Sequence, residues 1–242
     1  EKWLMTASSL HGSLTSPQTV YIQILGESTQ QQLETLVSGL KDPSSTPNFS
    51  EVAELFNREY KRYTRSEKKI LNLELNHYPV SIVDGLTHQP ELSTLLSTPS
   101  LFSFFKEKGV QARSESNAVV FIYFYPNVSA NLKSAFPDEY AGTHFSNKGS
   151  IFAPANIGFR LRVLFALSRE IAKIFGAEDK QDPVTGMPIF PIGYANAKEN
   201  PLYPQPKAEL MGKEIPLSSI QKKSVSSLNE VVIGPQTAYE LG

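Results

Sequence analysis

The segment between residues 169 and 179 carries the side chains that are best suited to chemistry. Glu170 and Asp179 are carboxylates, and a pair of carboxylates can transfer protons to and from a substrate. Two cations, Arg169 and Lys173, stand four residues apart on either side of Glu170, and Gly176 separates this group from Asp179. Opposite charges at this spacing indicate either an acid/base site or a cluster of ion pairs.

A mostly buried helix is predicted to carry the first part of this segment. Asn156 is a suitable N-cap and a glycine follows the last apolar position, so the sequence predicts a helix over residues 156–175. Arg162, Arg169 and Lys173 share one face of this helix. Because its other faces are apolar, these three cations need either a partner of opposite charge or a hydrated cleft. The apolar stripe consists of Phe159, Val163, Leu167, Ile171 and Ile174.

Strands and helices alternate along the rest of the chain, which predicts a layered α/β domain with a mixed sheet. The run at 118–125 is continuously apolar and rich in β-forming residues, as is typical of a strand covered on both faces. Further strands are expected at 19–25, at 149–155 and, as one or two strands, within 70–83. Helices are expected at 28–40, at 49–63 and in the second half of 90–108.

The segment from Arg169 to Asp179 resembles the HExxHxxGxxH/D motif of the metzincin-type zinc metalloproteases, a family with a zincin fold. In that motif, two histidines one helical turn apart bind zinc, and the glutamate beside the first is the general base. By position, Arg169 and Lys173 stand where the histidines would be. Glu170 keeps the place of the base, Gly176 that of the turn and Asp179 that of the third ligand.

Downstream residues extend the resemblance. The segment Ala208–Gly212, which contains Met211, is similar to the Met-turn that lies beneath the metal in this family. Residues 182–206 are rich in Pro, Gly and Tyr, as expected of a wall of the substrate cleft. Strand 149–155 sits where such folds place the edge strand that binds substrate, and Pro154 also favours a sheet edge.

The resemblance covers about a quarter of the chain and implies one zincin-like domain over residues 1–242. Within this domain, we expect a metalloprotease-like core at 116–242. The N-terminal part, residues 1–115, resembles no family that its motifs identify.

The implied zinc chemistry is expected to be lost. Zinc binds electron-pair donors, whereas a guanidinium has none and an ammonium must first lose a proton. Glu170 and Asp179 alone do not hold a catalytic zinc, and the four histidines, His11, His77, His88 and His144, have no ligand spacing. We therefore expect no metal and no cofactor. An ion pair from Arg169 or Lys173 to Asp179 could replace the charge of the metal.

These residues leave three hypotheses about function. The first is a catalytically inactive metalloprotease homologue, a pseudoprotease, that binds a partner protein, a peptide in the former cleft, or further copies of itself. The second is an active hydrolase with a non-zinc mechanism that uses Glu170 and Asp179, with Tyr194 or Tyr203 as a helper. The third is a structural subunit of a larger assembly without a working cleft.

Composition excludes several other classes. The formal net charge is −1, from 23 Lys and Arg against 24 Asp and Glu, so nucleic acid is not an expected partner. No apolar run approaches the ~18 residues of a membrane span, and without cysteine there is no disulfide or thiolate chemistry. The chain starts at Glu1, so we expect that a signal peptide, anchor or tag was removed. By analogy with the family, the expected location is extracytoplasmic, either periplasmic or secreted.

Overall fold

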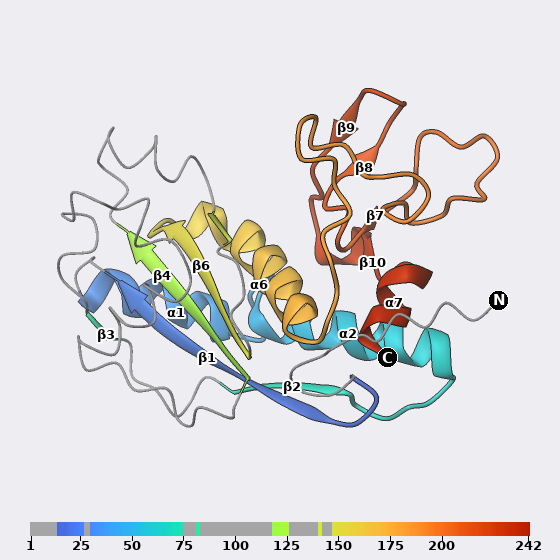
Figure 1. Ribbon diagram of the computed structural model, residues 1–242. Helices are drawn as coiled ribbons and strands as arrows, with labels where there is room; N and C mark the ends of the chain where they lie inside the picture. Colours follow the sequence, from blue (N-terminus) through green and yellow to red (C-terminus); the bar gives the residue numbers. More distant parts are fainter. Residues whose placement is uncertain (1–13, 27–29, 75–80, 83–117, 126–139, 142–146) are drawn as a thin grey trace. The chain divides into compact units, whose positions relative to one another are not determined.

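The computed structural model describes residues 14–26, 30–74, 81–82, 118–125, 140–141 and 147–242. Across these residues the protein is mixed α/β, with four α-helices and a largely parallel central sheet (Figure 1). The chain divides into two compact units. The sheet unit comprises Thr19–Ser50 and Asn72–Ile174, and the terminal unit comprises Glu1–Gln18, Glu51–Leu71 and Phe175–Gly242.

The central sheet has the strand order β2-β1-β4-β6-β5, and β3 pairs with the end of β1. Strands β1, β4 and β6 run parallel, with Ile22 opposite Val120 and Val120 opposite Gly149. Strand β5 is antiparallel to β6. The bounds are β1 Gln18–Gly26, β2 Leu71–Glu74, β3 Ser81–Ile82, β4 Ala118–Tyr125, β5 Tyr140–Ala141 and β6 Lys148–Pro154.

Strand β4 lies between β1 and β6, and all eight of its residues are buried. Its sequence, AVVFIYFY, has no polar face because a central parallel strand has no solvent-facing side. The prediction of a strand covered on both faces at 118–125 is therefore confirmed.

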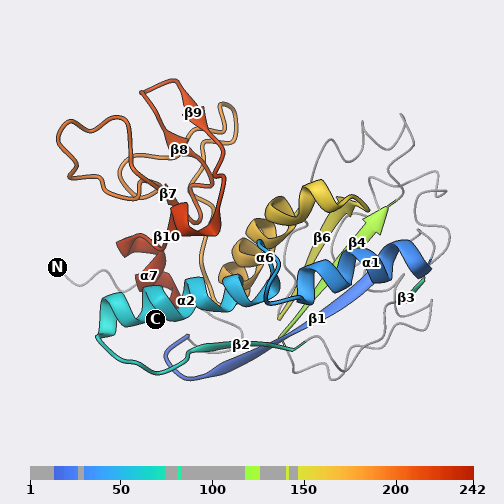
Figure 2. The same ribbon diagram turned by 180° about the vertical axis from the view of Figure 1, so that it is seen from behind.

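Two helices of the sheet unit, α1 (Gln30–Lys41) and α6 (Arg160–Ile174), cover one face of the sheet (Figures 1 and 2). A Cβ at Gly26 would meet Leu33 of α1, and a Cβ at Gly149 would meet Glu170 of α6. Gly26 pairs with Phe124 and Gly149 with Val120. Residues 120 and 124 face the same side of β4 because side chains alternate along a strand, so both helices lie on that side.

The terminal unit contains most of α2 (Phe49–Thr64) and the C-terminal segments. Arg58 donates from Nη2 to the Val231 carbonyl at 2.7 Å, and the Ile233 N–H donates to Glu59 Oε2 at 3.1 Å. These bonds fix α2 beside the chain that leads into α7. The other elements are β7 Ala208–Glu209, β8 Ile215–Pro216, β9 Lys222–Lys223, the 3-10 turn Leu228–Glu230, β10 Val231–Val232 and α7 Pro235–Leu241.

Most predicted elements are confirmed within a residue or two. The predicted helix 156–175 begins with a 3-10 turn, Ile157–Phe159, before α6, and Asn156 caps that turn by accepting from the Gly158 N–H. The strands expected within 70–83 are β2 and β3. The helix expected in 90–108 and the boundary near residue 115 lie outside the described residues, and the single zincin-like domain stays a prediction.

The position of strand 149–155 at the sheet edge was predicted wrongly. Strand β5 pairs with the outer side of β6, with Tyr140 opposite Phe152 and Ala141 opposite Ile151. Pro154 is the last residue of β6 and lies beyond this pairing, so its missing N–H breaks no bond to β5. Among the helices of the described segments, none combines the length and apolarity that crossing a bilayer requires.

Candidate functional site

Helix α6 buries two adjacent side chains of opposite charge, Arg169 and Glu170. Glu170 is completely inaccessible and Arg169 is nearly so. Lys173 Nζ lies 3.6 Å from Glu170 Oε1, and only 13% of the Lys173 side chain is exposed. The predicted contact between a cation and a carboxylate of the motif is therefore confirmed for Lys173 and Glu170.

Strand β6 packs closely against this carboxylate. A Cβ built on Gly149 would lie 3.0 Å from Glu170 Oε2 and 3.3 Å from Glu170 Cβ. Gly149 therefore leaves the space that the buried carboxylate fills. The importance of Gly149 was missed in the sequence, because it depends on the pairing of β6 with β4 and on the packing of α6.

The chain turns at Gly176, directly after α6. Gly176 has a φ of 106°, a conformation that favours glycine because it has no Cβ. The positive φ predicted for Gly176 is confirmed. Phe175 and Ala177 on either side are buried.

Within the terminal unit, the chain next to Asp179 lies along the turn at Met211. The Lys180 N–H donates to the Met211 carbonyl at 3.0 Å. The Lys180 side chain is 1% exposed, and its Nζ lies 2.6 Å from Glu240 Oε2 on α7. Residues 179–180 are therefore held beside Met211 by a backbone bond and to α7 by a buried ion pair.

Glu209 organises the turn at Met211. Its buried carboxylate accepts from the Met211 N–H at 2.7 Å and the Gly212 N–H at 2.8 Å through Oε2, and from the Gly234 N–H at 3.1 Å through Oε1. Burial raises the pKa of Glu209, and hydrogen bonds from the Gly234 and Gly212 N–H groups and the charge of Lys180 oppose this shift. One side chain thus joins the turn to the start of α7. Sequence reasoning missed this role, for which the sequence gives no local signal.

The segment 182–206, predicted to form a cleft wall, exposes several large apolar side chains. Phe190 is 55% exposed, Ile192 39% and Ile189 38%. The turn before them is fixed by Asp182, whose Oδ1 accepts from the Val184 and Thr185 N–H groups. Hydrogen bonds from Thr185 and Val184 lower the pKa of Asp182. An ordered turn therefore precedes three partly exposed apolar side chains.

The two tyrosines singled out in the sequence contact each other. The hydroxyl oxygens of Tyr194 and Tyr203 lie 2.8 Å apart, and the Tyr194 ring packs edge-on against Phe190 with centroids 5.3 Å apart. Burial and the bond to Tyr203 raise the pKa of Tyr194 to about 12. Tyr194 therefore holds its proton near neutral pH and is a poor acid or base there.

The motif residues fall in both units. Arg169, Glu170 and Lys173 belong to the sheet unit, and Gly176, Asp179 and Met211 belong to the terminal unit. An ion pair to Asp179 stays a prediction. The four histidines lie outside the described residues, and the described residues contain no group of three or more His, Cys, Asp or Glu side chains that could hold a metal ion.

No protein-family model matches this chain, and no curated protein is significantly similar to it.

Proposed function

We propose that this protein is a catalytically inactive homologue of the metzincin-type zinc metalloproteases that binds a protein or peptide. The observation that carries the proposal is the 3.6 Å contact between Lys173 Nζ and Glu170 Oε1. The residue at the second ligand position is a cation that contacts the carboxylate at the position of the general base.

This contact argues against zinc hydrolysis in two ways. A protonated amine offers no electron pair to a metal, and its positive charge beside the site repels a dication. Without a metal to activate water, this pair of residues supplies no hydroxide nucleophile.

The local geometry supports common ancestry with the zinc proteases. The motif helix ends at a glycine of positive φ, as the motif requires. The residue after Asp179 bonds to the Met211 carbonyl, so the place of the third ligand and the Met-containing turn are neighbours within the terminal unit. Both relationships join positions that the resemblance had already singled out.

The exposed apolar side chains of 182–206 support a binding role. Ile189, Phe190 and Ile192 present apolar surface on a segment whose turns are held by internal hydrogen bonds. An ordered apolar surface can bind with a small loss of conformational entropy. We propose that this segment contacts the partner, and that the protein acts in the periplasm or outside the cell.

The non-zinc hydrolase is the weaker hypothesis. The two tyrosines that would assist Glu170 and Asp179 in this mechanism, Tyr194 and Tyr203, hydrogen-bond to each other, and burial raises the pKa of Tyr194 to about 12. A general acid or base near neutral pH needs a pKa close to 7.

The experiment measures both the binding and the cleavage of peptides by the same purified protein. Peptides selected from a phage-displayed random library are synthesised, their affinities measured by calorimetry, and their integrity followed by mass spectrometry. We expect bound peptides to stay intact, and Phe190→Ser to weaken binding about tenfold or more. The control is Ile220→Ser, since Ile220 is 83% exposed and lies outside the segment. Cleavage by the wild type, or equal affinity in all three proteins, contradicts the proposal.

A further inference from the structure

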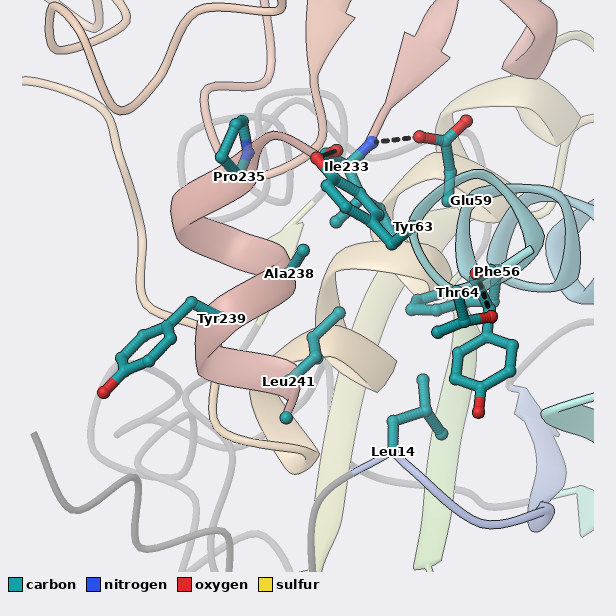
Figure 3. Close-up of a pocket in the computed structure, with 12 residues that line it drawn as sticks. Leu14, Phe56, Glu59, Tyr63, Thr64, Ile233, Pro235, Ala238, Tyr239 and Leu241 are labelled. Carbon is teal, nitrogen blue, oxygen red and sulfur yellow. Dashed lines mark hydrogen bonds between the residues drawn. The ribbon is translucent and has the colours of Figure 1, made fainter. Parts of the chain in front are cut away.

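The terminal unit contains a second feature, a cavity of about 310 Å³ between α2 and α7 (Figure 3). Ala238 and Leu241 of α7 line one side, Phe56 and Tyr63 of α2 line the other, and Leu14 lies at one end. None of these residues belongs to the motif or to the exposed surface of 182–206.

The polar groups beside the cavity are satisfied by the protein itself. The Tyr63 hydroxyl donates to the Ile233 carbonyl at 2.7 Å. The Glu59 carboxylate contacts Arg58 at 3.1 Å and Arg62 at 2.6 Å, and it also accepts from the Ile233 N–H at 3.1 Å. Its charge is therefore balanced by two arginines. A ligand here does not need a charged or strongly hydrogen-bonding group.

The size and walls of the cavity define the kind of molecule that fits. An apolar cavity of about 150 Å³ in a protein core can bind benzene, so one of 310 Å³ has room for about two fused rings. Phe56, Tyr60 and Tyr63 supply aromatic walls, which favour edge-to-face contacts with another ring. Tyr63 is 42% exposed, so an aromatic surface borders the cavity where it meets solvent.

We propose that this cavity is a binding site for one uncharged aromatic molecule of about two fused rings. The site is independent of the motif and of the proposed protein or peptide binding. Either proposal can therefore fail without the other.

Indole is the probe. It is titrated into protein labelled at the methyl groups of Ala, Ile and Leu, and methyl NMR spectra are recorded. We expect saturable shifts at Ala238, Ile233 and Leu241, with a dissociation constant below about 1 mM, as for a small ligand of this size. Decanoate, an aliphatic chain with a charged end, is the comparison ligand and is expected to bind at least tenfold more weakly.

Two variants localise the binding. Ala238→Phe places a ring in the cavity and should weaken indole binding at least tenfold. Ala53→Phe is the matched control, because Ala53 is also a partly buried helical alanine of the terminal unit and does not line the cavity. Thermal unfolding checks that both variants fold.

Three outcomes overturn the proposal: no saturable shift of the methyl signals of these three residues, tighter binding of decanoate than of indole, or indole binding that persists in folded Ala238→Phe. If Ala238→Phe does not fold, the wild-type methyl shifts and the comparison with decanoate decide the question.

Discussion

Lys173 Nζ lies 3.6 Å from Glu170 Oε1, one turn apart on α6, and the carboxylate is completely buried. A buried carboxylate is stable only when opposite charge or hydrogen bonds offset its desolvation. The lysine thus supplies locally the positive charge that a metal ion would supply in the family that the motif resembles.

The first prediction concerns this ion pair. Lys173→Met should lower the free energy of unfolding by roughly 3–5 kcal/mol, because it removes a cation that contacts a completely buried carboxylate. Replacing both residues, with Lys173→Met and Glu170→Gln, should recover most of the loss. Urea unfolding of the single and double variants measures the coupling. If Lys173→Met leaves the free energy of unfolding unchanged, the buried Glu170 carboxylate is not stabilised by this lysine.

The second prediction concerns the space beside Glu170. Gly149→Ala would place a Cβ 3.0 Å from Glu170 Oε2, so we expect a loss of roughly 1–3 kcal/mol in the free energy of unfolding. The same substitution combined with Glu170→Ala should lose less than the sum of the two single changes, since the shortened side chain removes the closer of the two contacts, the one with Oε2, and keeps only the 3.3 Å contact with Cβ. If the losses in the free energy of unfolding are additive, the contact with the Glu170 carboxylate does not cause the destabilisation by Gly149→Ala.

The third prediction concerns pH. Burial raises the pKa of Glu209 above its ordinary value of 4.5, so the folded state binds this proton more tightly than the unfolded state does. The stability that comes from this group is therefore complete below pH 4.5 and is lost as the pH rises through the folded pKa. Denaturant unfolding from pH 4 upward should show this decline in the wild type and a smaller one in Glu209→Gln.

The pKa of Glu230 is shifted in the opposite direction to that of Glu209. Hydrogen bonds from Ser226 hold the pKa of Glu230 below its ordinary value. Its contribution is therefore present above pH 4.5 and is lost as the pH falls through the lowered pKa. Glu230→Gln should reduce stability only above that range. An unchanged pH profile in Glu209→Gln, beside an altered one in Glu230→Gln, would refute the role given to Glu209.

The sequence predicted the elements whose signals are local. The apolar run of β4 and the apolar stripe of α6 each reflect burial of that element alone, and Gly176 carries its own turn signal. The edge strand was misplaced because β5 has only two residues, too few for a recognisable pattern.

The sequence did not show contacts between distant segments. Glu209 accepts from Gly234, 25 residues later, and Glu170 packs against Gly149, 21 residues earlier. Glu209 looks like a surface glutamate in sequence, because its carboxylate accepts from backbone N–H groups, which any residue except proline provides. The cavity was missed for the same reason, since α2 and α7 are far apart in sequence.

The fourth prediction restores the ligand set of the family. Arg169→His together with Lys173→His places two imidazoles one turn apart on α6, with Asp179 as the third ligand that the resemblance implies. Such a site should bind zinc measurably, without a return of proteolysis being required. Adding Asp179→Ala to this double variant should weaken zinc binding, and circular dichroism checks that each variant folds.

Calorimetric zinc titration of the wild type and this double variant tests most directly the central claim, that the chain is a zinc protease homologue whose ligands have been replaced by cations. We predict well under ~0.1 equivalent of zinc in the dialysed wild type and saturable binding of one zinc in the double variant. Stoichiometric zinc in the wild type that depends on Asp179, or a folded double variant without zinc affinity, would contradict it.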